Sequence, residues 1–194
     1  MGRRFQAVFV PWMMFAFVAR TGGQGATWAA AAALVAASLV VAAERRDGRA
    51  SGFAWSSAAL AAALLALGLM TQGDQFDVWG RCLAAIGLTA IAAASPRGTT
   101  FLDPYLRDLV APAMVRTPRF RATARAMAQT WTVALGAVAC SFAVAAGLQE
   151  PVTSTIGNWL VPTLIVLWAS DRAARRWDLD LGEEPGGLYG LFEA

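Results

Sequence analysis

The sequence predicts an all-α integral membrane protein, a bundle of six transmembrane helices with both ends in the cytoplasm. Hydrophobic residues make up 57% of the 194 residues and charged residues only 15%, and the mean hydropathy is +0.49. One water-soluble core cannot bury so much apolar surface, so a membrane protein is the expected class. Six spans of about 19 residues leave room for loops and ends but for no second folded domain.

Six apolar runs that carry almost no charge are long enough to span a bilayer. They run from Phe5 to Ala19, Thr27 to Ala43, Phe53 to Met70, Val78 to Ala94, Trp131 to Leu148 and Ile156 to Ser170. We expect the first run to be a retained helix and not a cleaved signal peptide, because it lacks a convincing small-x-small cleavage site.

The arginines predict the orientation, because positively charged loops stay on the cytoplasmic side. With the N-terminus inside, every arginine except Arg20 and Arg81 falls in a cytoplasmic segment. This alternation predicts a multi-pass membrane protein with both termini cytoplasmic. The chain then divides into a transmembrane domain at 1–176, with a basic cytoplasmic loop at 96–129, and an acidic, glycine-rich cytoplasmic tail at 177–194.

Three tryptophans share a position along the predicted spans. Trp28, Trp79 and Trp159 each stand at the outer start of an inward-running helix. An indole ring is amphipathic and anchors at the level of the headgroups, so we interpret these residues as outer interfacial anchors. Two readings of the pattern are open: three repeated helical hairpins, or ordinary interfacial tryptophans without a repeat.

The basic residues are all arginine, and the chain has neither lysine nor histidine. Histidine-ligated haem or zinc, a Ser-His triad, a Schiff base and a P-loop lysine are therefore excluded. Cys82 and Cys140 lie far apart in apolar stretches, where we expect both to be buried packing residues. We predict no catalytic, cofactor-binding or metal-binding residues.

Polar and helix-breaking residues are few within the spans. Arg81 lies near the outer end of the fourth span, four residues after Asp77, so the two side chains share a helix face and can pair at the helix end. Pro11 and Pro162 each remove a backbone hydrogen bond within a span. The resulting kinks either open a cavity or shape the packing.

The loop at 96–129 is long for so small a protein and is expected to hold structure of its own. We expect a short helix at 105–110 with Asp103 as its cap, and a second helix after Pro118 that leads straight into the fifth span. Three interpretations of its charge are open: a helix on an anionic leaflet, a solvated loop, or a docking surface for a partner. The candidate interaction residues are Arg107, Arg116, Arg119, Arg121 and Arg125.

The tail is expected to be disordered when free, because it is acidic and rich in glycine. Leu188, Tyr189 and Phe192 could instead dock on a neighbouring protein, and we include them among the candidate interaction residues.

Several motifs are shared with one family of small membrane proteins. They are Phe9-Val10-Pro11 in the first span, Glu44-Arg45-Arg46 after the second, Asp74-x-Phe76-x-x-Trp79 leading the fourth, and the proline-rich loop from Asp108 to Pro118 that returns to Trp131. In these features, and over the chain to about Arg176, the sequence resembles the bacterial intracellular septation protein A family. The resemblance implies a non-catalytic envelope protein that works through partners in cell division or wall synthesis.

We therefore expect a non-enzymatic inner-membrane scaffold or accessory protein that needs no cofactor, contacts membrane lipids and other membrane proteins, and binds no nucleic acid. One alternative is an auxiliary subunit of a large respiratory or photosynthetic complex, with a pigment, quinone or lipid on its tryptophan-rich faces. Another is a transporter of an uncharged or lipid-like solute. A polar-lined cavity near Pro11 and Pro162 would favour the transporter, and a solid bundle would count against it.

Overall fold

The fold was analysed in a computed structural model, which describes residues 3–19, 25–48, 51–71, 74–94 and 100–181. Within these ranges the chain forms helices and no strand. The long helices are α1 (Arg3–Val18), α2 (Gly25–Arg46), α3 (Gly52–Thr71), α4 (Asp74–Ala93), α7 (Pro118–Leu148) and α9 (Val161–Leu181), and the short ones are α5 (Asp103–Leu106), the 3-10 turn η1 (Arg107–Leu109), α6 (Pro112–Val115), α8 (Pro151–Thr155) and the π-helical turn η2 (Ile156–Leu160).

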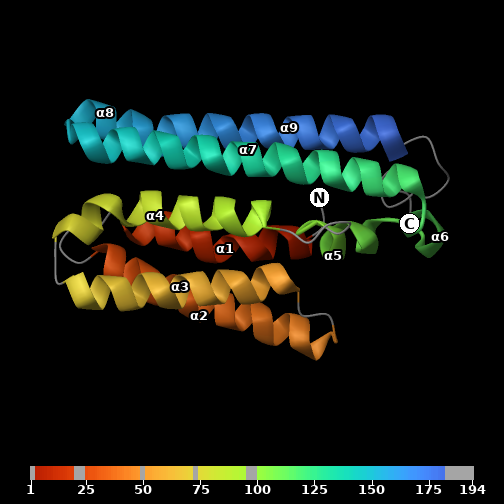
Figure 1. The fold of residues 1–194 in the computed structure, drawn as a ribbon, viewed down its shortest axis with the longest axis horizontal. Helices are drawn as coiled ribbons and strands as arrows, with labels where there is room; N and C mark the ends of the chain where they lie inside the picture. Colours follow the sequence, from red (N-terminus) through yellow and green to blue (C-terminus); the bar gives the residue numbers. More distant parts are fainter. Residues whose placement is uncertain (1–2, 20–24, 49–50, 72–73, 95–99, 182–194) are drawn as a thin grey trace.

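The long helices lie side by side in an all-α membrane bundle (Figure 1). Helix α2 packs between α1 and α3, α3 also contacts α4, and α4 packs against α7. Helix α9 is outermost and packs chiefly against α7. The short helices α5 and α6 lie at one end of the bundle, where α7 begins and α9 ends (Figure 1).

All six predicted spans are helical, and among the described residues five helices are long and apolar enough to cross a membrane. In α1 the stretch Phe9–Val18 is a shorter apolar helix of the described residues. The membrane bundle is thus confirmed, whereas the number of six crossings stays a prediction. Helix α9 runs past Arg176 to Leu181, so the first residues of the predicted tail are helical.

The core is built from alanines and aromatic rings. Helix α2 buries Ala26, Ala30, Ala33 and Ala37 along one face, so neighbouring backbones can approach it closely. The aromatic part centres on α1, where the Phe9 ring stacks on Trp131 of α7 at 5.5 Å and lies 6.2 Å from the ring of Phe53 in α3. Helix α1 therefore links the two sides of the bundle.

The prolines shape this packing. Pro11 is fully buried inside α1. Pro162 is the second residue of α9 and follows the π-helical turn η2, in which the Val161 amide bonds to the carbonyl of Ile156. A proline has no amide hydrogen to continue the regular ladder, which accounts for a widened turn next to it.

Two local predictions are wrong. Asp103 is the first residue of α5 and not its cap; the cap position is Leu102, which offers no side-chain hydrogen bond. Cys140 is exposed, while Cys82 is buried as expected. A residue on the outer face of a membrane helix can be apolar and still lie outside the core, and hydropathy alone does not separate the two places.

Candidate functional site

Exposed arginines gather at the end of the bundle that carries α5 and α6. We call this the arginine end; it comprises the end of α2, the start of α3, the segment 100–117, the start of α7 and the end of α9 (Figure 1). The exposed arginines there are Arg45, Arg46, Arg107, Arg116, Arg119, Arg121, Arg125, Arg172, Arg175 and Arg176. The five arginines predicted as interaction residues are all among them.

Most of these arginines lie on two neighbouring helices, α7 and α9. Helix α7 has 31 residues, which at a rise of 1.5 Å per residue gives roughly 46 Å, against about 30 Å for a hydrocarbon core. Helix α7 is therefore longer than one crossing requires, and its start, which carries arginines, lies beside the end of α9 (Figure 1). We call these two segments, 118–127 and 169–178, the arginine helix pair.

The arginine helix pair has an apolar seam and a charged outer surface. Phe120 and Ala124 of α7 belong to the same buried cluster as Ala173 and Trp177 of α9. Trp177 is only 3% exposed. The seam holds the two helices together, so the arginines are presented on a rigid support and not on a loose loop.

Two exposed tryptophans lie beside arginines at the arginine end. The Arg45 guanidinium lies 4.7 Å from the centre of the Trp55 ring, and that of Arg172 lies 5.8 Å from the Trp168 ring. Both indoles are exposed. Exposed tryptophan next to arginine is typical of the headgroup layer, where one side of the ring meets lipid and a cation can lie over its face.

A buried polar network joins three segments of the arginine end. The Tyr105 hydroxyl donates to Glu44 Oε1 at 3.0 Å and lies 2.8 Å from Ser51 Oγ, and the Ser51 amide donates to Glu44 Oε2 at 2.7 Å. Ser51 Oγ also accepts from the Ala54 amide, which caps α3. Burial raises the pKa of the Tyr105 hydroxyl; the Ser51 hydrogen bond lowers it in part and the Glu44 carboxylate raises it further. Tyr105 is thus a neutral donor at physiological pH.

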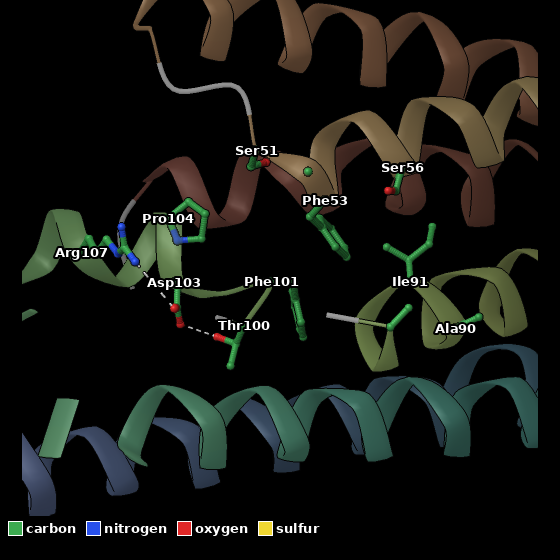
Figure 2. A pocket seen from close by; sticks show the side chains of 12 residues that line it. Ser51, Phe53, Ser56, Ala90, Ile91, Thr100, Phe101, Asp103, Pro104 and Arg107 are labelled. Atoms are coloured by element: carbon green, nitrogen blue, oxygen red, sulfur yellow. Dashed lines mark hydrogen bonds and ion pairs between the residues drawn. The ribbon is translucent and has the colours of Figure 1, made fainter. Parts of the chain in front are cut away.

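Two open cavities flank this network. The first, of about 720 Å³, lies between the start of α3, the end of α4 and the segment 100–107 (Figure 2). The second, of about 890 Å³, lies between the end of α2 and the short helices α5 and α6. Both are lined by Ser51, Gly52, Pro104 and Arg107.

The opposite end of the bundle holds the remaining predicted residues. Trp28 and Trp79 are exposed and Trp159 is half-buried, each near the start of its helical segment. Asp77 Oδ1 accepts from the Ala26 amide at 2.8 Å, and Arg81 Nη2 donates to the Ala19 carbonyl at 2.9 Å. Each side chain therefore satisfies a backbone group at the end of another helix. Their pairing with each other stays a prediction.

The sequence predictions and the structure overlap in part. Leu188, Tyr189 and Phe192 lie outside the described residues. The cavities and the Glu44–Ser51–Tyr105 network were missed, because they form between residues more than 50 positions apart. The available signal was the set of polar residues, Glu44, Ser51 and Asp103, that flank three spans at the same predicted side. No protein family, curated protein or solved structure matches this chain.

Proposed function

We propose that this protein is a non-enzymatic scaffold or accessory protein of a bacterial inner membrane, and that it binds an acidic partner through the arginine helix pair. In this proposal the arginine end faces the cytoplasm, following the rule that positive segments are retained there. The proposed partners are proteins of cell division or wall synthesis, as the resemblance to the septation protein A family implies.

The arginine helix pair is the observation that carries this proposal. Arg119, Arg121 and Arg125 are exposed on one helix, and Arg172, Arg175 and Arg176 on the other. Asp171, which pairs with Arg175, and Asp178 are the carboxylates within its two segments. A rigid surface with a clear excess of positive charge favours a complementary acidic surface and speeds the encounter with it.

The test is affinity purification of the full chain from its native membranes in a mild detergent, followed by quantitative mass spectrometry. The test variant combines Arg119→Gln, Arg121→Gln and Arg125→Gln. The matched control combines Arg45→Gln, Arg46→Gln and Arg116→Gln, which removes the same charge at the same end but outside the pair. We expect at least one stoichiometric partner that the test variant loses and the control keeps.

Two results would contradict the proposal. One is a partner set that is the same in the wild type and in both variants. The other is a purified chain that alone turns over or transports a substrate.

A second candidate function, an auxiliary subunit of a large membrane complex, is favoured by α9. Only 11% of the residues in the span that contains α9 are buried, against 28 to 39% in the other four long spans. The exposed large side chains of α9 include Leu164, Val166, Leu167 and Trp168, and Val152, Ile156 and Leu160 come before them in α8 and η2. Co-purification of a large complex whose yield falls with polar substitutions on this face would support the second candidate.

The transporter of an uncharged or lipid-like solute stays a prediction. Pro11 is buried in the packed core, and neither of the two cavities is lined by Pro11 or Pro162.

A further inference from the structure

The start of α7 presents two arginines on one exposed side of the helix. Arg121 and Arg125 are four residues apart, a spacing that brings their side chains together, and both are exposed. Arg121 Nη2 donates to the Arg116 carbonyl at 3.3 Å, and no carboxylate of the described residues pairs with Arg121 or Arg125. We call this surface the α7 arginine face.

The α7 arginine face has little negative charge near it within the described fold. Helix α7 contains no aspartate or glutamate from Pro118 to Leu148. In the neighbouring segment of α9, Asp171 already pairs with Arg175. The buried seam holds α7 against α9, so an acidic segment that reached this face would meet two cations on a fixed helix and would not have to order them.

The sequence that follows α9 has the opposite charge. Helix α9 ends at Leu181, beside the start of α7 (Figure 1). Residues 182–194 contain Glu183, Glu184 and Glu193 and no basic residue. They also contain aromatic rings, among them Tyr189, whose faces attract a guanidinium. The charge of these residues therefore complements that of the α7 arginine face.

Residues 182–194 are long enough to reach the α7 arginine face. At 3.3 to 3.6 Å per residue they span roughly 45 Å when fully extended. Arg125 lies only roughly 11 Å along the helix axis from Pro118, at a rise of 1.5 Å per residue. A short tether gives its ligand an effective concentration in the millimolar range, so a few exposed ion pairs suffice for docking although each is weak.

We propose that residues 182–194 dock on the α7 arginine face of their own chain and compete there with the acidic partner. The docking itself needs no partner, and only the competition rests on the proposed function. A partner with more carboxylates than the three glutamates of this segment displaces it, whereas a weakly acidic protein does not. The segment thus sets the charge that a partner needs.

The test is pulsed electron paramagnetic resonance of the full chain in detergent. Spin labels are attached at Ala122→Cys and Tyr189→Cys in a chain from which Cys82 and Cys140 have been removed. Ala122 is exposed beside Arg121, so this label reports on the face without removal of an arginine. We expect a short, narrow label-to-label distance at low salt. This distance should be lost at about 1 M salt, where the screening length is about 3 Å.

Charge reversal identifies the residues that hold the segment. Arg121→Glu with Arg125→Glu should abolish the short distance, and the further changes Glu183→Arg and Glu184→Arg should restore it. The matched control, Arg45→Glu with Arg46→Glu, reverses the same charge at the end of α2, on the far side of the bundle, and should keep the short distance (Figure 1). A normal thermal unfolding midpoint for each variant excludes misfolding as the cause.

Binding of a fluorescent polyglutamate peptide measures the competition. Neutralisation of the segment by Glu183→Gln, Glu184→Gln and Glu193→Gln frees the α7 arginine face in every molecule. The peptide should therefore bind about tenfold more tightly than it binds the wild type, in which most copies of the face are occupied.

The proposal is overturned if the label distance is long or does not respond to salt. It is also overturned if excess unlabelled chain removes the short distance, which would place the contact between two copies, or if neutralisation of the segment leaves the affinity for the peptide unchanged. The proposed function fails by a different result, a partner set that the variant of Arg119, Arg121 and Arg125 keeps in the affinity purification.

Discussion

Tyr105 connects the short helix α5 to α2 and α3 through a single hydroxyl group. Its hydrogen bond with Ser51 is buried and the one to Glu44 is partly buried, so removal of the hydroxyl takes one hydrogen bond from each partner. Tyr105→Phe should therefore lower the free energy of unfolding by about 1 to 2 kcal/mol. A thermal melt of the purified full chain in detergent measures this loss. The other tyrosine of the chain provides the control, Tyr189→Phe, and an equal loss in the control would contradict the assigned role.

The raised pKa of Tyr105 also predicts a dependence on pH. In the unfolded chain the hydroxyl ionises near pH 10, and in the fold it stays protonated to higher pH. The hydroxyl's contribution to stability is therefore complete below pH 10 and is lost as the pH rises further. Melts between pH 7 and pH 11 should show the wild type losing stability relative to Tyr105→Phe only above about pH 10. A constant difference over this range would refute the coupling.

Trp177 closes the seam of the arginine helix pair. It is buried near the end of α9, in a position where the sequence predicts the start of a solvated tail. Trp177→Ala should destabilise the fold by about 3 to 5 kcal/mol, as large-to-small substitutions in cores do. The matched control is Arg176→Ala, which removes the exposed side chain next to it. Equal thermal midpoints for the two variants would show that this end of α9 is not packed.

At the scale of the elements, α7 and the π-helical turn η2 pack closely at Gly157. A Cβ on Gly157 would lie 2.9 Å from Cβ of Ala145 and 3.2 Å from the Ser141 carbonyl oxygen, and neither atom is the end of a flexible side chain. Ser141 Oγ also donates to the Gly157 carbonyl at 2.6 Å. The contact therefore depends on the absence of a side chain at Gly157 and on the hydrogen bond that Ser141 donates.

Gly157→Ala should force α7 and η2 apart and destabilise the fold by about 1 to 3 kcal/mol, as overpacking usually does. Gly147→Ala is the control on the same pair of helices, because a Cβ there meets nothing within 4 Å. The measurement is the thermal unfolding midpoint of both variants. We expect a lower midpoint for Gly157→Ala and no change for Gly147→Ala. A normal midpoint for that variant would show that the helices separate without cost.

The elements themselves follow closely from the sequence. The length of each apolar run predicts a helix, and Pro118 correctly predicts the start of the helix that carries the fifth span. The capping role predicted for Asp103 is wrong, because its carboxylate accepts a hydrogen bond from Thr100 and pairs with Arg107. A capping rule counts local positions, whereas the choice among nearby partners depends on how the whole loop folds.

At the scale of the whole molecule, the arrangement of helices lies beyond what the sequence predicts. Hydropathy predicts where each span lies in the sequence. It does not predict which helices pack against each other, since every span is similarly apolar. Neighbours are chosen by shape, as where Gly68 accommodates Thr27 and Phe76. The two cavities depend on these choices and were therefore not predicted, whereas the clustering of arginines at one end follows directly from their alternation along the chain.

The central claim is that the polypeptide crosses the membrane repeatedly and leaves the arginine end on the cytoplasmic side. Single cysteines introduced by Asp47→Cys, Arg116→Cys and Arg175→Cys report on that end, and Gln149→Cys reports on the opposite end, in a chain from which Cys82 and Cys140 have been removed. The measurement is labelling with a thiol reagent that cannot cross membranes, applied to intact spheroplasts and to inverted vesicles. The account predicts that the first three react only in inverted vesicles and Gln149→Cys only in spheroplasts. Labelling of Asp47→Cys, Arg116→Cys or Arg175→Cys from the periplasmic side would contradict it.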